Sequence, residues 1–215
     1  IPNPIDTANW SDAPARWDVR HSLGVPKSDF LLFFAVDGRF REHRKGWDLL
    51  KSVLSKLDEK CHATGSKLHV VLVGKGAPRW HLSALNIHLQ PRLHNVQLRD
   101  LMATANLCLF PSRQDNSPNL VIESIAGGTP VLAFDHTGLA DLIVPDETGF
   151  LVRPFDTEAM ARNILELAQN PDENQRMRLA CKAFARANWD YSVVGKKYAD
   201  FLWRSVERFE FSGGD

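Results

Sequence analysis

The sequence has few cysteines, no long apolar run and no excess charge of either sign. Cys61, Cys108 and Cys181 form no C-x-x-C pair, and each lies within an apolar or helical pattern. This placement favours buried free thiols in a reducing compartment over a metal or redox role. The longest purely apolar run, 30–36, is far shorter than the about 20 residues of a spanning helix. We therefore expect no transmembrane segment, and no signal peptide pattern is found.

The charges balance, because 26 Lys and Arg stand against 26 Asp and Glu, with eight histidines counted as neutral. A neutral chain lacks the basic field with which proteins attract nucleic acids, so we expect no nucleic-acid partner. Of the 215 residues, 44% are hydrophobic and 24% are charged. These proportions are typical of a folded globular protein and exclude disordered, collagen-like and coiled-coil classes.

Several motifs of catalysis are also missing from the sequence. It contains no G-K-[ST] loop, and Arg79 follows Gly74-Lys75-Gly76 where a dinucleotide fingerprint needs its third glycine. The histidines show no H-E-x-x-H and no zinc spacing, so surface or structural roles and no metal site are expected. Without a G-x-S-x-G elbow, nucleophilic hydrolase chemistry has no support.

Short apolar runs alternate with amphipathic segments along most of the chain. We expect strands over 30–36, 68–73, 107–110, 130–134 and 149–152, with helices over 47–57, 96–105 and 118–126. This order predicts an α/β fold, a Rossmann-like three-layer α/β/α domain with a mostly parallel sheet.

Helices are expected to complete the chain. Asp156 is predicted to cap one helix, and Asn170, Pro171 and Glu173 to start the next. The last helix is expected over 191–209. Residues 1–12, rich in proline, are interpreted as an extended interdomain linker remnant, 13–209 as the folded domain with a first helix over 13–23, and 210–215 as a tail.

The most informative segment, 111–134, runs from a strand end through a polar loop into a helix and back to a strand. Ligands bind at this edge of open α/β sheets, and a helix that starts at Ser117-Pro118 presents free N–H groups to an anion. Asp115 and Glu123 flank this start. Each also has a simpler interpretation, Asp115 as a turn residue and Glu123 as an exposed helical position.

A basic cluster, 38–46, directly follows the first predicted strand. It contains Arg39, Arg41, Arg44 and Lys45. Arginine holds phosphate oxygens by bidentate bonds and lysine holds them as a point charge. A solvated basic loop is the alternative interpretation.

Asp115 and Glu123, within PSRQDNSPNLVIESIAGGTPVLA, resemble the carboxylate signature of the retaining GT-B glycosyltransferases of the "group 1" kind. Asp115 stands where that family usually has Glu. Gly38, Arg39, Lys45 and Gly46 match the family's G-R…K-G element, and TGFLV at 148–152 matches its T-G-x-L-V strand. The D-N-S-P-N version is similar to enzymes of bacterial exopolysaccharide assembly, such as colanic-acid-type transferases.

The resemblance implies one half of a GT-B fold, the domain that binds a nucleotide-diphosphate sugar. It implies that Arg39 and Lys45 clamp the diphosphate, that Asp115 bonds sugar hydroxyls and that Glu123 accepts both ribose hydroxyls. These cations would neutralise the leaving diphosphate, so Arg39, Lys45 and Asp115 are the expected catalytic residues. Backbone groups complete the implied site: Leu93 at the base edge, and Asn116, Ser117, Asn119 and Leu120 at phosphate and sugar.

The same resemblance implies a cytoplasmic transferase of polysaccharide biosynthesis that needs no cofactor and no metal. The acceptor, a glycan or a lipid-linked molecule, would bind to a preceding domain, so this chain alone is expected to bind donor and transfer little. Peripheral contact of the full-length protein with the inner face of the membrane stays open. Two alternatives also remain: a non-catalytic nucleotide-sugar binding subunit, and a related GT-B epimerase or phosphorylase.

Overall fold

The computed structural model contains one sheet of parallel strands in the order β3-β2-β1-β4-β5-β6. It describes residues 1–40, 42–76 and 81–212, without the side chains of 37–39, 137 and 208–212. The strands are β1 (Phe30–Arg39), β2 (Leu68–Lys75), β3 (Leu85–Gln90), β4 (Leu107–Phe110), β5 (Val131–Phe134) and β6 (Gly149–Val152). The predicted Rossmann-like α/β domain is therefore confirmed.

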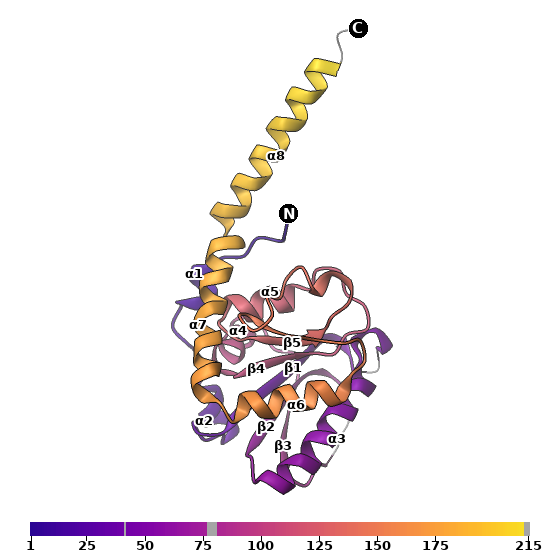
Figure 1. Cartoon of the computed structure of the whole chain (residues 1–215). Helices are drawn as coiled ribbons and strands as arrows, with labels where there is room; N and C mark the ends of the chain where they lie inside the picture. The colour runs from indigo at the N-terminus through magenta and orange to yellow at the C-terminus, as the bar shows by residue number, and fades with distance from the viewer. Residues whose placement is uncertain (41, 77–80, 213–215) are drawn as a thin grey trace.

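Helices cover both faces of this sheet (Figure 1). On one face lie α3 (Trp47–Thr64) and α6 (Thr157–Ala168), and on the other α4 (Asn95–Thr104), α5 (Asn119–Ala126) and α7 (Pro171–Asn188). The short elements are α1 (Thr7–Ser11), α2 (Val19–Leu23), η1 (His43–Lys45) and η2 (Thr137–Leu139). The predicted caps are confirmed, since Asp156 accepts a bond from Ala159 N and Asn170 from Glu173 N.

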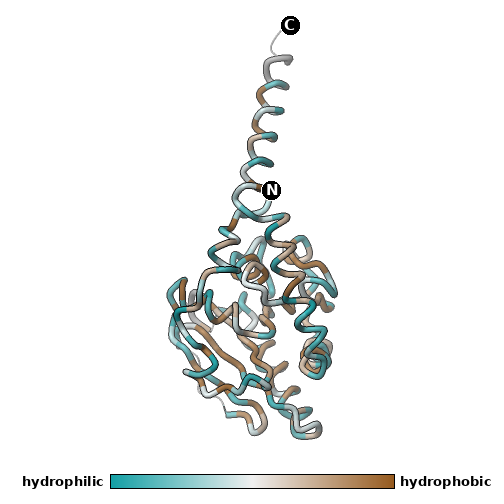
Figure 2. Tube along the Cα trace, turned by 90° about the vertical axis from the view of Figure 1, so that its left-hand side faces the viewer, coloured by the Kyte–Doolittle hydropathy of each residue, from teal (hydrophilic) through white to brown (hydrophobic). Residues whose placement is uncertain are grey.

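Two apolar clusters, one on each face of the sheet, form the core. Leu32 and Phe34 of β1 pack with α3 and α6, whereas Leu31 and Phe33 pack with α4 and α5. Successive strand side chains point to opposite faces, so a continuous apolar run fills both layers. Figure 2 shows these hydrophobic segments inside the body of the molecule.

Two local expectations are corrected by the structure, and one strand was not expected. The opening segment is not extended throughout, because Asp6 caps helix α1 by accepting a 3.0 Å bond from Asn9 N. The helix expected over 13–23 is limited to Val19–Leu23. Strand β3 was not predicted, since LNIHLQ alternates polar and apolar residues at the sheet edge and lacks a continuous apolar run.

The last helix, α8 (Tyr191–Ser212), leaves the body of the molecule (Figures 1 and 2). It extends into the segment expected as a tail. Several of its large apolar side chains are exposed: Tyr198, Phe201, Leu202, Trp203 and Val206.

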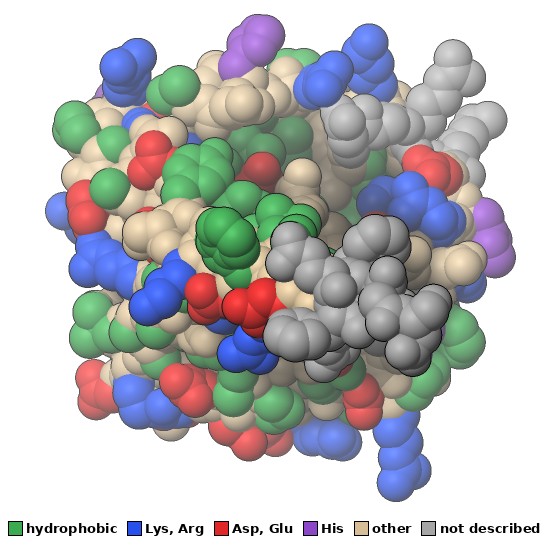
Figure 3. Space-filling view, turned by 90° about the horizontal axis from the view of Figure 1, so that it is seen from above, with side chains coloured by type: hydrophobic (Ala, Val, Ile, Leu, Met, Phe, Trp, Pro, Cys, Tyr) green, Lys and Arg blue, Asp and Glu red, His purple; other side chains and the backbone are tan. Residues whose placement is uncertain are grey.

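Seen from above, the surface shows basic and acidic side chains interspersed around hydrophobic ones (Figure 3). None of the described helices is long and apolar enough for a membrane span.

All three cysteines are buried and free, as the sequence pattern predicts. Burial raises the pKa of the Cys61 thiol to about 11 and that of the Cys108 thiol to about 12, and it also raises the pKa of Cys181. A thiol with such a pKa stays protonated near neutral pH and is a poor nucleophile. These residues therefore act as small apolar side chains of the core.

Two Phe→Ala substitutions test how unequally the core and α8 contribute to stability. Because Phe33 of β1 is fully buried, Phe33→Ala is expected to lower the free energy of unfolding by about 3–5 kcal/mol. Phe201, which is 59% exposed, is expected to change it by less than about 0.5 kcal/mol. Urea unfolding of both variants measures the difference, and equal losses would contradict the assignment of the core.

Candidate functional site

The candidate site lies between β1 and β4, where the order of the strands in the sheet reverses. Beyond β1 the chain continues to β2 and β3 on one side, whereas β4 is followed by β5 and β6 on the other. Loops diverge at such a point and leave a crevice at the carboxyl ends of the strands. A cavity of about 380 Å³ opens here, lined by Val36 of β1, Val73 of β2 and Phe110 of β4.

Most of the sequence-predicted site residues meet around this cavity. They are Lys45, Leu93, Asp115, Asn119, Leu120 and Glu123. Asn116 and Ser117 instead line a separate hollow of about 410 Å³ beside η2. The backbone of Arg39 ends β1 opposite Lys75, but the Arg39 side chain lies outside the described part, as do Arg41 and Arg79.

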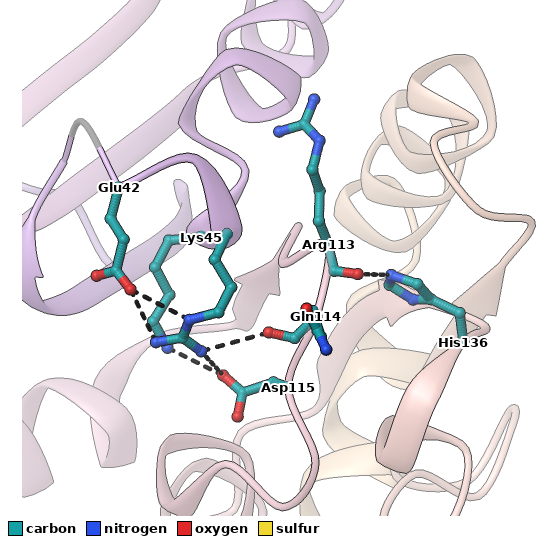
Figure 4. A network of polar contacts seen from close by, with 7 residues as sticks. Glu42, Lys45, Arg113, Gln114, Asp115 and His136 are labelled. Atoms are coloured by element: carbon teal, nitrogen blue, oxygen red, sulfur yellow. Dashed lines mark hydrogen bonds and ion pairs between the residues drawn. The ribbon is translucent and has the colours of Figure 1, made fainter.

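Two cations of η1 converge on the carboxylate of Asp115 (Figure 4). Asp115 Oδ2 lies 3.0 Å from Lys45 Nζ and 3.1 Å from Arg44 Nη1. Arg44 also bonds Glu42 Oε1 at 2.9 Å, and Lys45 Nζ lies 5.8 Å from the centre of the Phe110 ring. The Lys45 and Asp115 side chains are only 19% and 16% exposed, so solvent screens this pair incompletely.

A glycine contact brings η1 against the loop that follows β4. Gly46 has a φ of +68° in the left-handed region, and a Cβ there would collide with the carbonyl oxygen of Pro111. Next to this contact, Arg113 N donates a 2.8 Å bond to Arg44 O. The two loops are therefore joined by direct backbone contacts.

Arg113 reinforces this junction with its side chain. Its guanidinium donates to both carboxylate oxygens of Asp48, at 2.6 and 2.5 Å, and to His43 O at 3.2 Å. These bonds lower the pKa of Asp48 to about 2. On the other side, His136 Nε2 donates a 2.5 Å bond to Arg113 O (Figure 4). Arg113 and His136 thus position the loop that carries Asp115.

Helix α5 presents its first turn to the cavity. Pro118 precedes the helix and supplies no side-chain cap, and Asn119 and Leu120 line the cavity. First-turn amides lack intrahelical acceptors, and the helix dipole places positive charge at this end. Glu123, one turn further on, lines the same cavity, and burial raises the pKa of its carboxyl above the ordinary value.

Sequence reasoning did not assign several of the lining residues a role. Arg92, Asn95 and Leu98 belong to the connection after β3 and to α4. Because β3 was not predicted, the strand pattern did not place this connection at the carboxyl edge of the sheet, and only the family resemblance assigned one of its residues, Leu93, to the site. Arg44 was noted only as one charge of the basic cluster. Within residues 1–40, 42–76 and 81–212, no group of three His, Cys, Asp or Glu is arranged for a metal ion.

A sequence profile described as "Glycosyl transferases group 1" matches residues 32–170. The chain belongs to this family. It is 31% identical over 205 residues to a D-inositol 3-phosphate glycosyltransferase of Streptomyces scabiei, covering 88% of this chain and 45% of the relative. It is 27% identical over 201 residues to a phosphatidyl-myo-inositol mannosyltransferase of Mycolicibacterium smegmatis, with 90% and 48% covered. The chain thus spans about half the length of these curated relatives.

Solved structures of similar fold come from larger proteins. Sucrose-phosphate synthase from Thermosynechococcus elongatus superposes with a TM-score of 0.75 at 21% identity, over 97% of this chain and 52% of that one. Anabaena Alr3699/HepE in complex with UDP-glucose superposes with a TM-score of 0.73 at 18% identity, over 94% and 56%. At these identities the similarity confirms the fold alone, a Rossmann-like α/β domain.

Two Gly→Ala substitutions separate backbone strain from loop packing. Gly46 and Gly65 share a positive φ, but only Gly46 would place its new Cβ against another backbone. We expect Gly65→Ala to cost about 1–2 kcal/mol of unfolding free energy, and Gly46→Ala to cost clearly more because η1 must move away from Pro111. Urea unfolding compares the two, and equal costs would contradict a packing role for Gly46.

The bonds from Arg113 to Asp48 predict an acid-sensitive contribution to stability. Because the folded pKa is depressed from 3.8 to about 2, this contribution is complete above 3.8 and is lost as pH falls through about 2. The destabilisation caused by Asp48→Asn should therefore be largest near neutral pH and shrink across that window. In an Arg113→Gln background the substitution should have a clearly smaller effect, limited to the bonds that Asp48 accepts from backbone amides at the start of α3, and an undiminished effect would rule out Arg113 as the main cause.

Proposed function

We propose that this chain is the donor-binding domain of a retaining glycosyltransferase. The observation that carries the proposal is the convergence of the η1 cations, the first turn of α5 and Glu123 on one cavity. Cations and a helix N-terminus suit a diphosphate, and carboxylates suit hydroxyl donors. The Anabaena relative of similar fold, described in complex with UDP-glucose and with UDP, is consistent with a nucleotide-sugar ligand.

Each part of the donor then has a proposed contact. Lys45 and Arg39 hold the diphosphate, Asp115 accepts bonds from the sugar, and Glu123 accepts bonds from the ribose hydroxyls. The backbone of Leu93 faces the base. The amides of Asn119 and Leu120, in the first turn of α5, face phosphate and sugar, whereas Asn116 and Ser117 line the separate hollow beside η2.

The proposed chemistry follows from where charge develops. As the bond between the anomeric carbon and the diphosphate oxygen breaks, negative charge grows on the leaving phosphate. Lys45 and the dipole of α5 face that charge, so they stabilise the transition state more than the ground state, and we propose the same role for Arg39. The oxygen of the incoming hydroxyl forms a bond to the anomeric carbon on the same face of the sugar, and its proton passes to the leaving phosphate. Retention then needs no carboxylate nucleophile from this chain, and the donor serves as substrate without a further cofactor or metal.

We further propose that the acceptor, a glycan or lipid-linked molecule of polysaccharide biosynthesis, binds outside these residues. The curated relatives are about twice as long as their shared region. This chain alone should therefore bind donor and transfer little sugar. The working enzyme is proposed to act in the cytoplasm.

Calorimetric titration with UDP, GDP and ADP tests the donor site directly. We expect saturable binding of one nucleotide and no transfer of sugar to water or glycans by the chain alone. Absence of binding for all three nucleotides would reject the donor site. Rapid glycosyl transfer by these 215 residues would instead reject the separate acceptor region.

Glu123→Gln is expected to separate binding from stability. Loss of the charged acceptor should weaken nucleoside diphosphate binding about tenfold to a hundredfold. Because burial raises the folded pKa, the ionised carboxylate lowers stability above the unfolded value of 4.5. The variant should therefore be at least as stable as the original chain near neutral pH.

Glu166, an exposed residue of α6, provides the matched control. Glu166→Gln should alter neither nucleotide affinity nor the urea midpoint. Equal affinity of the Glu123→Gln variant and the original chain would contradict the ribose assignment.

A further inference from the structure

A single carboxylate oxygen already occupies the space between two cations of the candidate site. Asp115 Oδ2 lies 3.0 Å from Lys45 Nζ and 3.1 Å from Arg44 Nη1, and all three side chains line the same cavity. Charge-assisted bonds of this length are also the ones that a phosphate oxygen makes with lysine and arginine. The Asp115 oxygen shown with its contacts in Figure 4 therefore has the charge and the kind of partners that a bound phosphate oxygen would have.

Arg44 is held in place for such a contact. Its Nε and Nη2 bond Glu42 Oε1 at 3.1 and 2.9 Å, while Nη1 reaches Asp115 and the carbonyl of Gln114. The backbone oxygen of Arg44 is fixed by Arg113 N at 2.8 Å. Because backbone and guanidinium are both anchored, Arg44 can exchange one anion for another without losing its position.

A bound diphosphate and the Asp115 carboxylate cannot both occupy this position between the cations. Two like charges about 4 Å apart repel by about 1 kcal/mol in water and by about 4 kcal/mol at an effective dielectric constant near 20. With Asp115 only 16% exposed, the screening is weaker than in bulk water. A phosphate that enters the site must therefore displace Asp115 from the cations.

We propose that Asp115 is an internal placeholder for the donor diphosphate, and that Arg44 is a further phosphate-binding residue. In the empty site, Asp115 neutralises Arg44 and Lys45. Donor binding replaces these bonds with bonds to phosphate, and the released carboxylate accepts hydroxyl bonds from the sugar. The inference rests on the proposed donor site and adds a competition to it.

The exchange gives Asp115 opposite effects on two ligands. A bare diphosphate displaces Asp115 from the cations and supplies no hydroxyl donor to the displaced carboxylate. A sugar donor does supply hydroxyl groups, which donate bonds to it. Specificity is a difference between two affinities, so a group that penalises the bare diphosphate favours the intact donor. After transfer, renewed pairing of Asp115 with Arg44 and Lys45 promotes release of the product.

Titration of the full chain with inorganic pyrophosphate, and with whichever of UDP, GDP or ADP it binds, tests the exchange. Asp115→Asn should tighten both ligands about threefold to fivefold, because each lost ion pair is worth up to about 1 kcal/mol. Arg44→Gln should weaken both by a similar factor. Far-UV circular dichroism confirms that each variant is folded.

Asp12→Asn is the matched control, since it adds the same charge and breaks an exposed ion pair with Arg186. It should leave both affinities unchanged. Unchanged or weaker ligand binding by the Asp115→Asn variant would overturn the placeholder while leaving the donor site standing. If the original chain binds no nucleoside diphosphate, the donor site itself is rejected and the placeholder with it.

Discussion

The site depends on one backbone contact, the packing of Gly46 against Pro111. It joins the loop after β1 to the loop after β4 at the point where the strand order reverses. Lys45 and Asp115 are separated by 70 positions in the chain, yet this contact brings them to 3.0 Å. A side chain at position 46 would push the loops apart and spread the same charges over an open surface. Because Gly46 has no side chain, the loops after β1 and β4 can approach closely enough to line one cavity.

Around this contact two arginines, Arg113 and Arg44, have different partners. Arg113 is committed to Asp48 and His43 and holds the loops together. Arg44 lines the cavity and pairs with Asp115 there. A chain of zero formal charge can therefore keep two cations at the cavity, because the charge of Arg113 at the loop junction is neutralised by Asp48. The loop junction should tolerate a change of ligand, since none of its own ion pairs has to open.

Much of this arrangement was predictable from local patterns. Continuous apolar runs identified the inner strands, and the sequence around Asp115 and Glu123 identified the start of α5 and its edge of the sheet. Strand β3 was missed because this half-exposed edge strand alternates polar and apolar residues and lacks a continuous apolar run, and Asn95 was missed with it. The roles of Arg44 and Arg113 depend on partners 65 to 71 positions away, which no local pattern encodes. Similarly, the helix α1 depends on a single cap by Asp6, in a segment where two prolines suggested extended chain.

Asp115 and Glu123 show how the environment separates two carboxylates of similar chemistry. Glu123 is half-buried, and the desolvation that raises its pKa makes an incoming hydroxyl donor a net gain. Asp115 already holds two cations, so a new bond to it is largely offset by the bonds it gives up. Under the proposed function, the nucleoside portion therefore supplies most of the affinity, and the sugar portion decides whether the diphosphate is retained. Such a division suits a transferase, which must hold a donor firmly and yet release the same nucleotide once the sugar has left.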